Sequence, residues 1–314
     1  MHYLGEVLSL AVALFWTVTA LCFEYASKRT GALPLNLIRL VMALVMLGLL
    51  LTCLTGSPLP LHADSATWFW LAISGLIGFV FGDFCLFYAY VRIGSRFTQL
   101  MMTLAPPAAA IGGTLILNQR LSGSAILGMV VTLTGIVLSI VGKGDGDGSR
   151  IRLKLPVKGL LLAVGAGIGQ GIGIVFSKLG MDHYTLSLTA AGAEQKLFEL
   201  IPFAASQIRI ITGIVGFTLL LLFSGKIREL VPAFRQRKAM GIAAVGTFFG
   251  PFVGVSLSLM AVQYTDTGIA STLMALTPIM ILLPAHYLYR QKITSAEIIG
   301  AVISVIGVSI FFIG

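Results

Sequence analysis

Long apolar stretches separated by short polar segments dominate the pattern of this chain. Ten of them approach the roughly 20 residues that an α-helix needs to cross a bilayer. Glycine, proline or charged residues bound each stretch. The stretches cover residues 4–25, 34–54, 67–89, 94–117, 122–142, 156–178, 201–224, 239–262, 267–289 and 294–314.

The apolar runs are continuous rather than alternating, so they predict helices and not the strands of a membrane β-barrel. Composition supports this, because 57% of the 314 residues are hydrophobic and 11% are charged, with a mean hydropathy of +0.97. Soluble domains carry about 25% charged residues. We therefore expect an all-α membrane protein with ten transmembrane helices, and no removable signal peptide at its N-terminus.

Basic residues gather in alternate loops. Sixteen of the 21 Lys and Arg residues follow the odd-numbered stretches, whereas Arg120, Lys178 and Lys196 lie on the opposite side. The positive-inside rule places the basic loops in the cytoplasm. We expect a multi-pass protein of the cell (inner) membrane with both termini extracytoplasmic. The net charge of +9 does not indicate a nucleic-acid partner, because no continuous basic face is present.

The chain contains an internal repeat. One constant shift along the sequence brings Pro106 onto Pro278, and a shift smaller by two positions brings Arg39 onto Arg209. The identity between the two copies is low, but glycines and prolines keep the same spacing. Each copy holds five apolar stretches.

Because five is an odd number, the second copy crosses the membrane in the opposite sense. Inverted repeats recur in secondary transporters, whose substrate site lies near the bilayer midplane between the halves. We expect two inverted five-helix repeats, residues 1–142 and 156–314, joined by a cytoplasmic linker at residues 143–155.

Prolines interrupt the fourth and ninth stretches. Pro106, Pro107 and Pro278 lack a backbone donor, so Pro106 frees the carbonyl of Met102 and Pro278 that of Met274. Such breaks persist in a membrane only where protein or a water-filled cavity satisfies the freed group. We expect these prolines to act as hinges or gates beside a central cavity; a kink kept for packing is the alternative.

Polar side chains inside the stretches are candidates for the cavity wall, and ionisable ones are functional candidates by default. Helical spacing places Gln99 and Thr103 on the face of Pro106. Trp16 is a stacking surface or a packing residue, and His286 is a ligand or an interfacial histidine. The expected cavity set is Trp16, Asp83, Tyr88, Gln99, Thr103, Gln170, Ser256, Ser271 and His286.

Three further ionisable residues lie near the ends of stretches. Glu24 and Arg39 are both near the cytoplasmic side and are expected to pair with each other. Arg209 lies toward the outer side, where Glu194 or Glu199 could neutralise it. If protons drive the cycle, Glu24 or the Asp83 named above is the expected carrier.

A glycine-rich run at residues 165–173 resembles a dinucleotide-binding loop. A functional loop of that kind follows a β-strand, and no strand is predicted before this run, so we do not expect it to bind a dinucleotide. Its four-residue spacing predicts close helix packing through Gly165, Gly169, Gly173 and Ser177 instead. We find no metal-ligand cluster, Walker loop or serine–histidine pair, and expect neither a cofactor, a metal nor enzyme activity. The three cysteines predict no disulfide framework.

Together these features resemble the EamA-like branch of the drug/metabolite transporter superfamily over essentially the whole chain. The family usually carries a glutamate where this chain has Gln119 and Gln291, so a role tied to that charge does not carry over. The resemblance rests on the Trp16 region, on Arg39 and Arg209 early in the second helix of each half, on the segments of Pro106 and Pro278, and on the glycine pairs Gly128–Gly135 and Gly300–Gly307.

The resemblance implies a transporter but not a substrate, since members move amino acids, purines, sugars, drugs or nucleotide sugars. Aromatic, hydroxyl and amide groups favour a small polar metabolite, such as an amino acid, over a polyanion. We expect an exporter that works without ATP by alternating access around a central cavity, as a monomer or a homodimer. A lipid flippase or scramblase is the nearest alternative, followed by a membrane-embedded enzyme.

Overall fold

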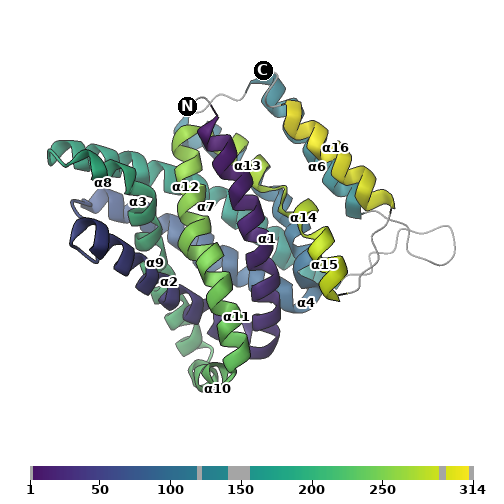
Figure 1. The fold of residues 1–314 in the computed structure, drawn as a ribbon, viewed down its shortest axis with the longest axis horizontal. Coiled ribbons are helices and arrows are strands. Elements are labelled where there is room, and N and C mark those ends of the chain that lie inside the picture. The colour runs from purple at the N-terminus through teal and green to yellow at the C-terminus, as the bar shows by residue number, and fades with distance from the viewer. Residues whose placement is uncertain (1–2, 119–121, 141–155, 290–294, 311–314) are drawn as a thin grey trace.

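The computed structural model describes residues 3–118, 122–140, 156–289 and 295–310, and every regular element in them is helical (Figure 1). The first half holds α1 (Leu4–Thr30), α2 (Ala32–Thr55), α3 (Ser65–Gly75), η1 (Leu76–Asp83), α4 (Phe84–Met101), η2 (Met102–Leu104), α5 (Ala105–Leu117) and α6 (Gly123–Ile140). The second half holds α7 (Val157–Ala190), α8 (Gln195–Glu199), α9 (Ile201–Phe223), η3 (Ile227–Glu229), α10 (Leu230–Arg235), α11 (Arg237–Thr247), η4 (Phe248–Phe252), α12 (Val253–Tyr264), α13 (Thr267–Met274), α14 (Thr277–Met280), α15 (Leu282–Tyr289) and α16 (Ser295–Ile310).

Seven segments of the described residues are long and apolar enough to cross a bilayer. One of them, Ser65–Leu117, is 53 residues long and contains two of the expected stretches. They are separated at Gly94, whose φ of 78° is accessible to glycine without strain. Helices α6 and α16, with 18 and 16 residues, are not among the seven. The all-helical membrane class is confirmed, whereas the count of ten spans is not.

Each half of the chain packs mainly against the other half. Helix α2 packs on α9, α1 packs on α11 and α12, and α7 packs on α3, η1, α4 and α5. Helices α6 and α16 lie side by side at one edge of the molecule (Figure 1). Their approach is close, because a Cβ at Gly307 would lie 2.4 Å from the backbone nitrogen of Thr132. The two halves therefore interlock.

Glycines on α7 bring it against the third helix of the first half. A Cβ at Gly169 would lie 3.0 Å from the Cα of Gly82, and a Cβ at Gly173 would lie 2.9 Å from the Cα of Gly78. This contact agrees with the close packing that the four-residue spacing predicts. It also places Gln170, between the two glycines, directly beside η1.

The third helix of each half contains a π-helical segment. Segment η1 begins at Leu76 and η4 begins at Phe248, and the shift that brings Pro106 onto Pro278 also brings Leu76 onto Phe248. The structure therefore repeats this irregularity together with the sequence. Such π-helical segments are rare and occur frequently at functional sites. Asp83 is the last residue of η1.

Helix α7 is longer than the apolar pattern predicts. It extends for 34 residues to Ala190, whereas the apolar stretch ends at Lys178. The hydroxyl of Tyr184, in the extra turns, donates to the carbonyl of Leu61 at 2.7 Å. The extension is therefore held in part by the segment between α2 and α3, and hydropathy does not reveal such a contact.

Candidate functional site

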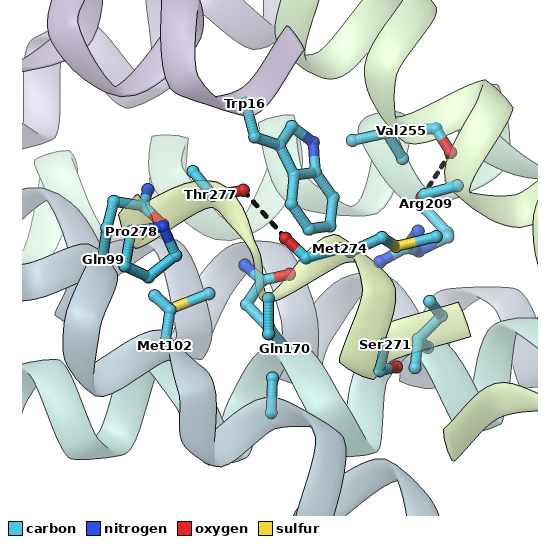
Figure 2. A pocket seen from close by; sticks show the side chains of 14 residues that line it. Trp16, Gln99, Met102, Gln170, Arg209, Val255, Ser271, Met274, Thr277 and Pro278 are labelled. Atoms are coloured by element: carbon cyan, nitrogen blue, oxygen red, sulfur yellow. Dashed lines mark hydrogen bonds between the residues drawn. The ribbon is translucent and has the colours of Figure 1, made fainter. Parts of the chain in front are cut away.

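A cavity lies where helices of both halves meet (Figure 2). Side chains of α1, α4, η2, α5, α7, α9, α12, α13 and α14 form its wall. The volume of the cavity is about 50 Å³. One water molecule needs about 10–15 Å³ of cavity volume. This conformation therefore has room for a few waters.

Six residues that the sequence analysis singled out line the cavity. The indole of Trp16 projects into it from α1 (Figure 2), and a Cβ at Gly254 would lie 3.3 Å from the indole nitrogen. Glycine at position 254 thus avoids a tight contact with the ring, and also a closer one, at 2.3 Å, with the carbonyl oxygen of Phe249. The six residues are Trp16, Gln99, Gln170, Arg209, Ser271 and Pro278.

Both halves supply this wall through positions that the repeat relates. The shift that brings Pro106 onto Pro278 relates three pairs of cavity residues, so the fourth helix of each half contributes the same face. Neither half alone supplies the wall. The pairs are Gln99 with Ser271, Met102 with Met274, and Ala105 with Thr277.

The face of the fourth helix differs from the predicted one after Gln99. The structure places Met102 and Ala105 at the cavity instead of Thr103 and Pro106. The reason is η2, a 3₁₀ segment, in which residues three apart are aligned instead of the alternating three and four of an α-helix. Thr103 is buried and donates to the carbonyl of Leu100 at 2.7 Å.

The prolines begin helices rather than interrupt them. Helix α5 carries both of its prolines in its first turn, and α14 carries Pro278 there, where a missing N–H costs little. The carbonyl of Met102 accepts from the N–H of Ala105. The carbonyl of Met274 accepts from the Thr277 hydroxyl at 2.8 Å (Figure 2). The protein itself therefore satisfies both freed carbonyls.

Other expected cavity residues lie outside the wall. Tyr88 packs on Phe84, with ring centroids 4.7 Å apart. Ser256 is buried and donates to the carbonyl of Phe252 at 2.6 Å, whereas Ser258, on the same helix, lines the cavity. The side chain of His286 lies outside the described residues.

Asp83 lies behind the cavity wall in a buried network. It pairs through Oδ2 with Arg39 and accepts from Gln170 through Oδ1 at 2.7 Å. Arg39 also donates from Nε to the amide oxygen of Asn36 at 2.9 Å. Arg39 and Asp83 are 3% and 4% exposed. Both oxygens of the carboxylate thus have partners, and one of these partners, Gln170, lines the cavity.

The expected pair of Glu24 with Arg39 is wrong. Glu24 pairs with Lys28 one turn later on α1 and accepts from the backbone N–H of Ser95 at 2.9 Å and from its hydroxyl. Ser95 follows the turn at Gly94, so the Glu24 carboxylate caps the helix that starts there. A role for Glu24 or Asp83 as a proton carrier stays a prediction.

Arg209 projects into the cavity from α9 (Figure 2). Neither expected acid pairs with it. Its Nε is buried without a hydrogen-bond acceptor, and the guanidinium lies over the ring of Phe79, 4.8 Å from the centroid. Close approach to η1 is possible because a Cβ at Gly78 would lie 2.9 Å from Nη2 of Arg209.

Sequence reasoning missed several cavity residues because they are apolar or small. Met102 and Met274 form an identical pair in the repeat next to the proline segments, and that identity was the signal available for them. Val255 gave no such signal. Among the described residues, no group of three or more His, Cys, Asp or Glu side chains is placed to hold a metal ion.

Comparisons with known proteins agree with the repeat. The model of the EamA-like transporter family matches residues 3–141 and again residues 157–313. No curated protein matches the sequence significantly. A solved structure titled "Crystal structure of protein" is similar in fold over 100% of this chain and 98% of that chain, with a TM-score of 0.65 and 16% identity. The family matches confirm the resemblance seen in the sequence.

Proposed function

Because the chain belongs to the EamA-like transporter family and is a multi-pass membrane transporter of the drug/metabolite type, we propose that it exports a small polar metabolite, such as an amino acid, by alternating access. Ten spans in two inverted units, residues 1–142 and 156–314, would carry out the cycle without ATP. The linker at 143–155 would lie in the cytoplasm, and both termini would lie outside it, in the cell (inner) membrane.

The observation that carries this proposal is the cavity between the halves. Its wall combines an indole, two amides, hydroxyls and one guanidinium with apolar side chains, a mixture suited to a small polar ligand. Repeat-related residues contribute from both halves. Two similar halves that share a site can exchange conformations and so open that site to either side in turn.

The helix breaks beside the cavity support movement of this kind. Segment η2 interrupts the fourth helix of the first half, and α13, α14 and α15 divide the corresponding helix of the second half into short pieces. The narrow space in this conformation means that a metabolite enters only if the halves or these pieces shift. We propose Pro106, Pro107 and Pro278 as the points about which they do so.

Flux through reconstituted vesicles tests the proposal. Purified protein is screened by thermal unfolding against metabolites, since a ligand of the folded state raises the unfolding temperature, and each hit is loaded into vesicles without ATP. We expect protein-dependent efflux of at least one hit. Trp16→Ala should reduce it at least about tenfold through lost stacking and packing, whereas Phe69→Ala, at an exposed aromatic residue of α3, should not.

The same vesicles separate the alternatives. Movement of a headgroup-labelled lipid between leaflets, with no metabolite flux, would replace the proposal with a flippase. Chemical conversion of a hit, rather than its release outside the vesicle, would replace it with an enzyme.

A further inference from the structure

Two buried arginines, Arg39 and Arg209, lie over the ring of Phe79, and an acid is paired with Arg39 alone. Arg39 pairs with Asp83. Arg209 is 4% exposed, its Nε has no acceptor, and no carboxylate of the described residues lies within ion-pair distance of it. The cluster therefore carries one positive charge more than its acid can neutralise. A buried charge that lacks a partner is unfavourable.

The repeat explains how this imbalance arises. Arg39 corresponds to Arg209, and Asp83 corresponds to Val255 through the shift that brings Pro106 onto Pro278. The first half thus has an arginine with its acid, whereas the second half has an arginine and has valine in place of the acid. Val255 and Arg209 both line the cavity (Figure 2). The place of the absent carboxylate is open to a ligand.

We propose that Arg209 binds the carboxylate of a small monoanionic or zwitterionic substrate, which takes the role that Asp83 has toward Arg39. This inference rests on the proposed transport function and narrows its substrate class. A guanidinium presents paired donors that match a carboxylate, and the donors of Arg209 are not used by described protein groups. The ring of Phe79 attracts the cation but does not neutralise it.

The rest of the wall restricts the substrate further. Arg209 is the one charged side chain among the described residues that line the cavity, so a single negative charge is matched and a dianion is not. Trp16, Ile174, Met102 and Met274 surround the remaining space with apolar surface. The class is therefore a monocarboxylate with an apolar or aromatic body, which excludes sugars, nucleosides and cationic drugs.

Binding to the purified protein tests the assignment. The probes are benzoate, 4-methylpentanoate, leucine and phenylalanine, each compared with its amide at constant chloride. We expect at least one carboxylate to raise the unfolding temperature of the wild type, and its amide to have no effect. Arg209→Gln should raise the Kd of that carboxylate at least about 30-fold, the loss typical of a buried charge pair.

Val255→Asp supplies the absent acid within the protein. The new carboxylate should pair with Arg209 and displace the ligand, with a loss of affinity as large as that of Arg209→Gln. The side chain of Val255→Asn is nearly the same size as that of Val255→Asp but is uncharged, so this variant should lose less affinity for the carboxylate. Arg237→Gln, at an exposed position of α11, controls for the removal of an arginine. Elution of each variant as a single species shows that it is folded.

Several results would overturn the inference. They are equal binding of a carboxylate and its amide to the wild type, a Kd for Arg209→Gln within threefold of the wild-type value, and stabilisation through Arg209 by chloride alone with no added effect of any carboxylate. The comparison of a carboxylate with its amide needs only the wild type.

Transport measurements separate this inference from the proposed transport function. If vesicles transport an uncharged metabolite equally with wild type and Arg209→Gln, this inference fails and the transport function stands. If carboxylates bind through Arg209 but no metabolite is moved, the transport function fails and the binding of carboxylates by Arg209 stands.

Discussion

Asp83 is buried and pairs with Arg39, whereas Arg209 has no acid within ion-pair distance among the described residues. Both carboxylate oxygens of Asp83 are in use, Oδ2 by Arg39 and Oδ1 by Gln170. Removing one partner of a buried ion pair costs about 3–5 kcal/mol, because the other charge is left without compensation. A replacement at Asp83 should therefore destabilise the protein, whereas a replacement at Arg209 should not.

We expect Asp83→Asn to lower the free energy of unfolding by about 3–5 kcal/mol, since it leaves the buried guanidinium of Arg39 without its acid. Arg209→Gln should leave the free energy of unfolding unchanged or raise it, because it removes the charge that has no partner. Unfolding of the purified, ligand-free protein in one detergent measures both effects.

Two further variants make the comparison specific. Adding Arg39→Gln to Asp83→Asn should recover part of the lost stability, and Arg237→Gln should have no effect because that side chain is exposed. A loss for Arg209→Gln as large as that for Asp83→Asn would show that Arg209 has a stabilising partner in the folded protein and would contradict the charge imbalance.

Sequence alone could identify these ionisable residues but not their pairing. Asp83, Arg39 and Arg209 stand out because charges within apolar stretches are rare. Arg39 and Asp83 are 44 residues apart, however, and Glu24 is the nearer acid along the chain. The pairing depends on which helices are neighbours, and hydropathy carries no information on that.

At the scale of helices, the contact between α7 and η1 depends on glycine at both surfaces. A Cβ at Gly173 would lie 2.9 Å from the Cα of Gly78, which is backbone and cannot move aside without shifting a helix. We expect Gly173→Ala to lower the free energy of unfolding by about 1–3 kcal/mol, the usual cost of overpacking. Chemical or thermal unfolding in detergent measures the change.

The matched control is the same substitution at Gly241 on α11, where a Cβ would meet nothing within 4 Å. Alanine is favoured over glycine within a helix by about 0.5–1 kcal/mol, so Gly241→Ala should be neutral or stabilising. Equal effects of the two substitutions would mean that α7 and η1 are not in close contact.

Helix boundaries followed from the apolar pattern where lipid sets the length, as in α2 and α9. The apolar pattern did not predict the helix features that depend on local backbone geometry or on contacts outside the apolar region. The 3₁₀ segment η2 moved the cavity face from Thr103 to Met102, and contacts outside the apolar region extended α7 to Ala190. Hydrophobic periodicity does not reveal either effect. The glycine spacing on α7, in contrast, was visible in the sequence because close packing requires small residues at those positions.

At the scale of the whole molecule, the repeat accounts for more than any single motif. Helices of one half pack on helices of the other, and the irregular segments η1 and η4 occupy corresponding positions in the two halves. The sequence could show the repeat because glycines and prolines fix backbone geometry and keep their spacing. It could not show the departure from symmetry at Val255 as a cavity feature, since that requires knowing that Val255 and Arg209 share one space.

The arrangement of the spans leads to a prediction about orientation. If each repeat contains five spans, the linker at residues 143–155 and the C-terminus are separated by five crossings and must lie on opposite sides of the membrane. The excess of Lys and Arg in the odd-numbered loops places the linker in the cytoplasm. We therefore expect alkaline phosphatase fused after Gly314 to be active, and a fluorescent protein that matures only in the cytoplasm to fluoresce when inserted in the linker. Exchanging the two reporters should abolish both signals.

Two other outcomes have different meanings. If the reporters place the linker and the C-terminus on the same side, the second repeat has an even number of spans, and an inverted five-helix pair is excluded. If they place them on opposite sides but with the reverse polarity, the inversion stands and only the charge rule is contradicted.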